Sequence, residues 1–327
     1  MVKGIRCQLQ EIQGDYTKML KFNRNSLPLD KPISASLDRA APFISSSIES
    51  KVPMKLLKLD MSGIDTDRLL TATNEALELY GNFNYRLGVN AAGQDQLDQG
   101  YAGIGLSYNP DHNEREDCNI HQQVQGSFKP AKRDGKHGFS ALGANEGKQY
   151  AVRNSHYDTF SLSYRTPASK HGYLGEFLDS CKRTMVRSAV RIINSEVIGS
   201  ANIDGQRRAG VTWHRDESMF QNLRVNIPLI TNPNFVLEQE GSPPVHLPAG
   251  HAYSWDTHVL HRAYALEKTE QSFSRIHLML GFSCWWDFNE ETGEWSQNEF
   301  FGKKHPKDML IDGDVIPGLK LDLDFSY

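Results

Sequence analysis

The chain has 327 residues, of which 39% are hydrophobic and 23% are charged, so it has enough apolar mass for a core and wholesale disorder is excluded. The 36 Lys and Arg residues against 40 Asp and Glu give a formal net charge of −4. This balance argues against a nucleic-acid-binding protein, because such proteins usually carry a basic excess. The length allows one large domain or two ordinary ones.

The four cysteines lie far apart and form no CxxC pair, which disfavours both a cysteine zinc site and a disulfide framework. Residues 1–20 contain no apolar stretch typical of a signal peptide. The sequence also has no apolar run of about 18 residues or more, the length that predicts a membrane span. We therefore expect a cytoplasmic protein with reduced thiols.

The first half of the chain shows one clear helical pattern. Residues 1–55 have little periodicity and predict an extended segment that wraps a core. After Asp65, apolar residues recur at helical spacing as far as Tyr80, which predicts an amphipathic helix with an acceptor at its N-cap and an end at Gly81. A strand is predicted over 101–108.

The second half of the chain is dominated by short β-type runs. A polar stretch over 109–154 predicts a long loop, and 172–181 predicts a second helix. The strand-like runs that follow, each bounded by Gly, Pro or Asn, are 186–193, 210–214, 223–229, 245–247, 252–255 and 274–282. Such closely spaced runs favour a sandwich or barrel over a βαβ sheet, so we expect a mainly β fold with flanking helices.

A His-x-Asp motif ends one of these predicted strands. His214 and Asp216 are two residues apart, and residues at that spacing on a strand project to the same face. Two further histidines, His258 and His261, follow at a suitable distance, and the pattern alone leaves both open as a third ligand. Two His and one carboxylate on one face form the facial triad of non-haem Fe(II) oxygenases, which leaves coordination positions open.

Arg275 begins an apolar predicted strand fourteen residues after His261. A guanidinium in such a context is costly to desolvate unless an anion accompanies it. Its planar fork suits a bidentate carboxylate, such as the far carboxylate of 2-oxoglutarate. An internal salt bridge is the alternative explanation.

The order of these elements resembles the Fe(II)/2-oxoglutarate-dependent oxygenases, and more narrowly the aspartyl/asparaginyl β-hydroxylase-like branch, which includes bacterial proline hydroxylases. The similarity covers about residues 180–290, and the N-terminal half matches no motif. The segments that carry it are 212–216, 223–229, 248–250 and 254–256, together with His261 followed by Arg275.

The resemblance implies a double-stranded β-helix core of the jelly-roll or cupin type. We place this core over 151–295, after a helical and loop layer over 1–150 and before a C-terminal extension over 296–327, within a single composite domain spanning 1–327. Both internal divisions are expectations, since only the central segment carries matching motifs.

The resemblance also implies roles for individual residues. It makes His214, Asp216 and His261 iron ligands and Arg275 the anchor for 2-oxoglutarate. The family places an Asp five residues before its distal His, and Asp256 stands in that relation to His261, which favours His261 over His258.

A second set of residues is predicted to line the pocket for substrate or cosubstrate. Arg224 matches an Arg of a family strand motif, and Asn226 stands where a His is common. His277 shares strand parity with Arg275. The set comprises Arg224, Asn226, His277, Arg191 and Trp255, and Arg187 joins Arg191 as a candidate contact for an anionic substrate.

The resemblance implies a dioxygenase that hydroxylates an unactivated C–H bond of an amino acid, or of an amino-acid residue in a peptide. Fe(II), 2-oxoglutarate and O₂ are the expected cofactors, succinate and CO₂ the coproducts, and ascorbate a stimulant. The presence of Asp216 argues against a halogenase, which needs that position vacant for halide. The alternatives are a metal-binding cupin-like enzyme that does not use 2-oxoglutarate, and a non-catalytic binding barrel.

Overall fold

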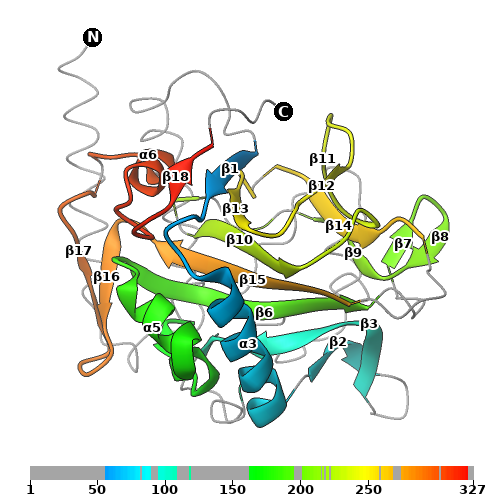
Figure 1. Ribbon diagram of the computed structural model, residues 1–327, viewed down its shortest axis with the longest axis horizontal. Coiled ribbons are helices and arrows are strands. Elements are labelled where there is room, and N and C mark those ends of the chain that lie inside the picture. The colour runs from blue at the N-terminus through cyan, green and yellow to red at the C-terminus, as the bar shows by residue number, and fades with distance from the viewer. Residues whose placement is uncertain are drawn as a thin grey trace.

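The computed structural model describes residues 56–81, 83–89, 95–108, 118, 162–194, 201–214, 216, 219–220, 222–257, 259–267, 274–301 and 303–322. These residues form a mainly β structure with few helices, in which an eight-stranded and a four-stranded sheet hold most of the strands (Figure 1). The expectation of a mainly β fold with flanking helices is confirmed. No described helix has the length and apolar character that crossing a membrane requires.

The larger sheet is antiparallel at every pairing between neighbouring strands. Its strands, in spatial order, are β18 (Lys320–Leu321), β1 (Leu57–Asp60), β13 (His251–Ser254), β10 (Leu223–Ile230), β15 (Ser274–Ser283), β6 (Thr184–Asn194), β3 (Asp95–Gly105) and β2 (Phe83–Val89). In Figure 1 the blue β1 lies beside the red β18, so the sheet joins segments from near both ends of the chain. The part before residue 150 therefore supplies strands as well as a helix, and the predicted division at 150 and 295 stays a prediction.

The smaller sheet is also antiparallel. Its strands, in spatial order, are β12 (Val245–His246), β11 (Phe235–Gln239), β14 (His261–Ala265) and β9 (Gly210–His214). Three two-stranded pairs complete the β structure: β4 (Ser107–Tyr108) with β5 (Tyr164–Arg165), β7 (Ala201–Ile203) with β8 (Gln206–Arg208), and β16 (Trp286–Asn289) with β17 (Glu294–Gln297). A double-stranded β-helix remains the predicted assignment for this pair of sheets.

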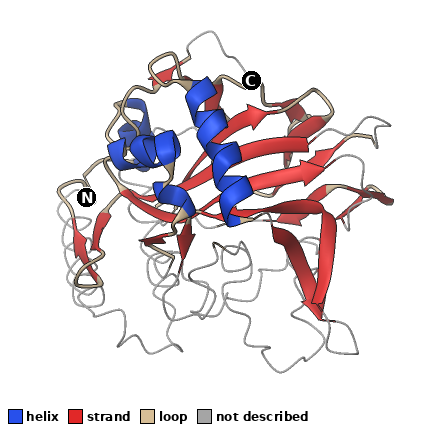
Figure 2. Ribbon diagram, turned by 60° about the horizontal axis from the view of Figure 1, so that its bottom comes forward, coloured by secondary structure: helices blue, strands red, loops and turns tan. Residues whose placement is uncertain are grey.

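Two helices cover one face of the larger sheet (Figure 2). The first is α3 (Thr66–Tyr80), where sequence periodicity predicts it, and the second is α5 (Gly172–Ser180), one residue shorter than predicted. Asp65 caps α3 by accepting a hydrogen bond from the Arg68 N–H at 3.0 Å. Gly81 ends it at φ 91°, a backbone angle that favours glycine.

The face of the sheet beneath these helices is apolar. Alternate residues of β10, β15 and β6 share one buried cluster with the inward side chains of α3 and α5. The strand members of this cluster include Val225, Ile227, Leu229, Ile276, Leu278, Leu280, Val190 and Ile192. Alternation at period two therefore places the hydrophobic core between this face and the helices.

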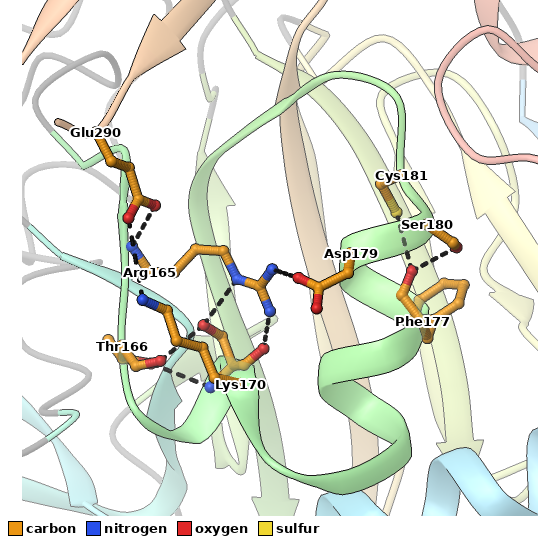
Figure 3. A network of polar contacts seen from close by, with 9 residues as sticks. Arg165, Thr166, Lys170, Phe177, Asp179, Ser180, Cys181 and Glu290 are labelled. Carbon is orange, nitrogen blue, oxygen red and sulfur yellow. Dashed lines mark hydrogen bonds and ion pairs between the residues drawn. The ribbon is translucent and has the colours of Figure 1, made fainter.

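A polar network fixes α5 and the preceding 3₁₀ helix η5 (Ala168–Lys170) to β5 (Figure 3). The Arg165 guanidinium pairs with Asp179 near the end of α5 and donates to the Ser169 carbonyl, and its Nε lies 3.2 Å from Ser169 Oγ. The Arg165 N–H donates to Glu290 Oε1 at 3.3 Å. One arginine thus ties three segments together beside the sheet. The short helix α6 (Pro306–Ile311) completes the described helices.

Candidate metal centre

The candidate metal ligands come from neighbouring strands of the smaller sheet. His214 is the last residue of β9, and His261 is the first residue of β14 and its direct partner across the two strands. Asp216 lies just beyond β9, where its N–H donates to the Thr257 carbonyl at 2.9 Å. Strand pairing and this backbone hydrogen bond bring the three side chains to one place.

The three side chains converge closely. One donor atom from each of His214, Asp216 and His261 lies within 4.8 Å of the others. Asp216 Oδ2 is 4.0 Å from Nε2 of each imidazole, and the two ring centroids are 4.3 Å apart. The structure places His261 in the cluster, and His258, the alternative third ligand, lies outside the described residues.

The hydrogen bonding of His261 prepares it to bind a metal. Its Nδ1 lies 2.9 Å from the Val259 carbonyl oxygen, so Nδ1 carries the proton and Nε2 presents a lone pair to the cluster. Burial, and then the neighbouring His214, lower the pKa of His261 to about 3, which keeps the ring neutral at physiological pH. The Trp255 ring packs edge-on against it, with centroids 5.9 Å apart.

The donor set fits a divalent transition metal. Bonds of about 2.0–2.2 Å allow one ion to reach two donors up to roughly 4 Å apart, so the 4.0 Å separations in this cluster lie at the edge of that reach. Two imidazoles and one carboxylate suit Fe(II), with positions left open opposite the protein ligands. His214, Asp216 and His261 are therefore the residues of the described chain that would hold iron.

The predicted pocket residues of the larger sheet share the face opposite the helices. His277 pairs with Pro228 on one side and Arg191 on the other, and directly paired residues project to the same face. Arg224 and Asn226 have the same strand parity as Pro228. All four predicted residues of these strands, Arg191, Arg224, Asn226 and His277, are buried. The larger sheet thus has two different faces. We call the apolar face that packs against the helices the outer face, and the opposite face, which carries these four polar residues, the inner face.

This polar face lies toward the candidate metal ligands. Trp255 follows β13, clusters with Leu237 and Leu247 of the smaller-sheet region, and touches His261. The positive charge of Arg224 contributes to the lowered pKa of His261, although less than burial and His214 do. The inner face of the larger sheet and the candidate ligand cluster therefore lie close to each other.

Arg275 lies against an imidazole of its own strand. Its Nε donates to His277 Nε2 at 2.8 Å, and its Nη2 is 2.6 Å from His277 Nδ1. Burial, followed by the charge of Arg275, lowers the pKa of His277 well below its usual value, so this ring is also neutral. The structure therefore places a guanidinium beside a buried neutral histidine on the inner face.

Arg224 is held by the protein itself. Its Nη1 donates to the Arg187 carbonyl at 3.1 Å, and the amide oxygen of Asn222, when it faces the guanidinium, accepts from Nε and Nη2 at 2.9 and 3.2 Å. The Arg224 carbonyl accepts from Ser254 Oγ at 2.7 Å. These contacts join β10, β6 and β13, so Arg224 has a scaffolding function whether or not it also touches a ligand.

Another buried arginine lies behind the candidate metal ligands. Arg262, next to His261 on β14, projects to the other side of the smaller sheet and stacks over Trp213, 4.5 Å from its ring centroid. Its Nε lies 2.7 Å from Glu238 Oε2, and its two terminal nitrogens each lie 3.1 Å from an oxygen of Asp204. Sequence analysis missed this cluster, although alternation puts Trp213 and Arg262 on the face opposite the two histidines.

The Arg187 side chain lies beside Asp216, one of the candidate metal ligands. Its Nη1 lies 3.9 Å from Asp216 Oδ1, and its side chain is buried. Sequence analysis proposed Arg187 as a contact for an anionic substrate, and no spacing rule linked it to Asp216. No sequence signal would have found this approach, because it depends on an irregular register between β6 and β15.

The comparisons with known proteins yield weak similarities. No family model matches the sequence, and no curated protein does. The chain is similar to a number of solved structures, including the following three. The non-haem alpha-ketoglutarate-dependent epimerase SnoN from nogalamycin biosynthesis has 11% identity and a TM-score of 0.31, over 76% of this chain and 82% of its own. A 2OG-Fe(II) oxygenase family oxidoreductase from Burkholderia pseudomallei has 10% identity and a TM-score of 0.32, over 76% and 90%.

The third similar structure is AviO1 from Streptomyces viridochromogenes Tue57. It has 17% identity and a TM-score of 0.21, and the match covers 57% of this chain and 90% of that protein. Similarities of this size do not define a family for the chain, so its function has to be argued from its own residues.

Proposed function

We propose that this protein is an Fe(II)- and 2-oxoglutarate-dependent dioxygenase that hydroxylates a C–H bond of an amino acid or of an amino-acid residue in a peptide. The observation that carries the proposal is the convergence of His214, Asp216 and His261 on one point between the two sheets. We assign these sheets to a double-stranded β-helix.

The ligand set supports iron in particular. His261 presents Nε2, because Nδ1 is engaged by the Val259 carbonyl, and Asp216 Oδ2 faces both imidazoles. Bound at such a triad with open positions, Fe(II) supplies the oxidising chemistry from O₂ and 2-oxoglutarate, with succinate and CO₂ as coproducts. Ascorbate would stimulate turnover by keeping the iron reduced.

Arg275 and His277 support a carboxylate cosubstrate. A guanidinium beside a buried neutral imidazole offers several N–H donors to the far carboxylate of 2-oxoglutarate, which Arg275 would bind through its planar fork. The neutral state of His277 avoids a second buried positive charge, which would be costly to desolvate. The two residues would therefore orient the cosubstrate toward the metal.

The remaining residues of the inner face would bind and orient the substrate. Trp255 packs against His261 and is buried, so it would exclude water from the side of the ligand cluster. Asn226 and Arg191 supply polar groups on the same face of the sheet. Such groups are suited to the carboxylate or amide of an amino acid.

The test is succinate formation from 2-oxoglutarate with Fe(II) and ascorbate, measured across a panel of free amino acids and short peptides. We expect one member of the panel to stimulate turnover, and we expect the His214→Ala variant to abolish it. Arg275→Ala should raise the KM for 2-oxoglutarate strongly. Iron binding with no effect of Arg275→Ala on 2-oxoglutarate affinity would overturn the proposal in favour of a metal enzyme without this cosubstrate.

A further inference from the structure

The two oxygens of the Asp216 carboxylate face different partners. Oδ2 lies 4.0 Å from both imidazole nitrogens, whereas Oδ1 lies 3.9 Å from Nη1 of Arg187. The carboxylate is 12% exposed and the Arg187 side chain 8%, so this ion pair is largely shielded from water. We propose that Arg187 is a positioning residue that holds Oδ1, so that Asp216 binds the metal through Oδ2 alone. This inference rests on the metal site of the proposed function.

The backbone holds Arg187 in an unusual place. Its φ is +40°, a left-handed angle that is unfavourable for a residue other than glycine. The register of β6 against β15 is interrupted between Met279 and Gly281, the irregularity that accompanies a β-bulge. Bulges redirect side chains and occur preferentially near functional sites. The strand irregularity is therefore the feature that places this guanidinium against Asp216.

Several contacts keep the irregular segment in this conformation. The Arg187 N–H donates to the Leu162 carbonyl at 3.0 Å, and its carbonyl accepts from Arg224 Nη1 at 3.1 Å. Ser188 Oγ accepts from the Gly281 N–H at 2.8 Å, across the interrupted register. A strained backbone conformation persists only where surrounding contacts hold it in place. These hydrogen bonds hold the left-handed conformation of Arg187.

Binding through one oxygen preserves room at the metal. Six-coordinate Fe(II) with three protein donors keeps about three positions open, enough for a chelating 2-oxo acid and O₂ together. A chelating aspartate would occupy one of these positions. Groups behind a metal ligand commonly determine its orientation and donor strength, and a buried guanidinium is well suited to hold the second oxygen of a carboxylate.

The experiment counts water molecules on a bound metal. Mn(II), a spectroscopic substitute for Fe(II), is loaded into the wild-type protein and the Arg187→Gln variant, and its inner-sphere waters are measured by water-proton relaxation. We expect the relaxivity per bound Mn(II) to fall by about a third in Arg187→Gln, because Asp216 then displaces one of about three waters. Arg187→Lys, which retains a positive charge, should recover part of the loss.

The matched control is Arg183→Gln, which removes another shielded arginine of the same segment. Arg183 pairs with Asp287 and Glu299 and takes no part in the metal site, so this variant should keep the wild-type relaxivity. Unchanged relaxivity in Arg187→Gln with Mn(II) bound would overturn the inference. Failure of the wild-type protein to bind Mn(II) would instead overturn the proposed metal site itself.

A second measurement needs no variant at position 187. Carboxylate stretching bands of the wild-type protein with ¹³C-labelled aspartate are recorded with and without Mn(II), and Asp216→Asn identifies the band of this residue. We expect a wider separation of the antisymmetric and symmetric stretches on metal binding, as in carboxylates bound through one oxygen. A narrower separation, typical of a chelating carboxylate, would contradict the inference even if Arg187→Gln failed to fold.

Discussion

Strands β10, β15 and β6 show different chemistry on their two faces. Toward the helices they carry Val, Ile and Leu side chains that share one core cluster with α3 and α5. Toward the candidate metal ligands they carry Arg191, Arg224, Asn226 and His277, which are almost as deeply buried. The same three strands therefore build the hydrophobic core on one side and the candidate site on the other.

The difference between the faces teaches where stability and function are located. Burying apolar area is favourable by about 25 cal/mol per Å², whereas burying polar or charged groups is costly unless they are paired. The Asn222, Arg187 and Ser254 contacts of Arg224 show how part of that cost is offset. Substitutions on the outer face should thus change stability, and substitutions on the inner side should change binding.

The largest effect should follow loss of a metal ligand. We expect His261→Ala to weaken Mn(II) or Co(II) binding by roughly 100-fold or more, because one of three protein donors is removed. Binding is measured by electron paramagnetic resonance titration or calorimetry on protein whose fold is checked by circular dichroism. Metal affinity equal to that of the wild type would show that His261 is not a ligand.

A large effect on stability should follow truncation on the outer face. Leu278 is fully buried in the core, so Leu278→Ala should lower the free energy of unfolding by about 2–5 kcal/mol. Its neighbour Met279 projects to the inner face and is only partly buried, so Met279→Ala should cost about 1 kcal/mol. Urea denaturation measures both, and equal losses would remove the distinction between the faces.

Acid should destabilise the folded protein through His277, which is buried on the inner face. Burial lowers its pKa in the folded protein, whereas in the unfolded chain it titrates near about 6.5. Below that pH the unfolded state binds more protons, so stability falls as pH falls. We expect His277→Gln to reduce this slope by up to about 1.4 kcal/mol per pH unit, as measured by urea denaturation between about pH 7.5 and 5. Identical slopes for variant and wild type would argue against a buried neutral His277.

The smallest effect should come from an exposed ion pair on the surface of the two helices. Arg68 of α3 and Glu176 of α5 form an ion pair at 3.3 Å, but their side chains are 58% and 64% exposed. A double-mutant cycle with Arg68→Ala and Glu176→Ala should give a coupling free energy of about 0.2–1 kcal/mol. A coupling as large as the Leu278→Ala loss would show that the helices are held by charge and not by apolar packing.

Local patterns in the sequence determined much of this molecule. The 3.6-residue period and the Asp65 cap predicted α3, and short strand-like runs between turn residues predicted β9, β10 and β15 within one or two residues. The short spacing of His214 and Asp216 predicted that they converge. These features depend on residues a few positions apart, whose relative placement follows from the geometry of one helix or strand.

Only the tertiary structure decided how distant segments meet. The short strand β14, which periodicity did not predict, takes its place from pairing with β9 and β11, and that pairing sets His261 opposite His214. The approach of Arg187 to Asp216 likewise depends on an irregular register between β6 and β15. Register and bulges are determined by side-chain packing and hydrogen bonding among strands remote in sequence, so no local spacing encodes them.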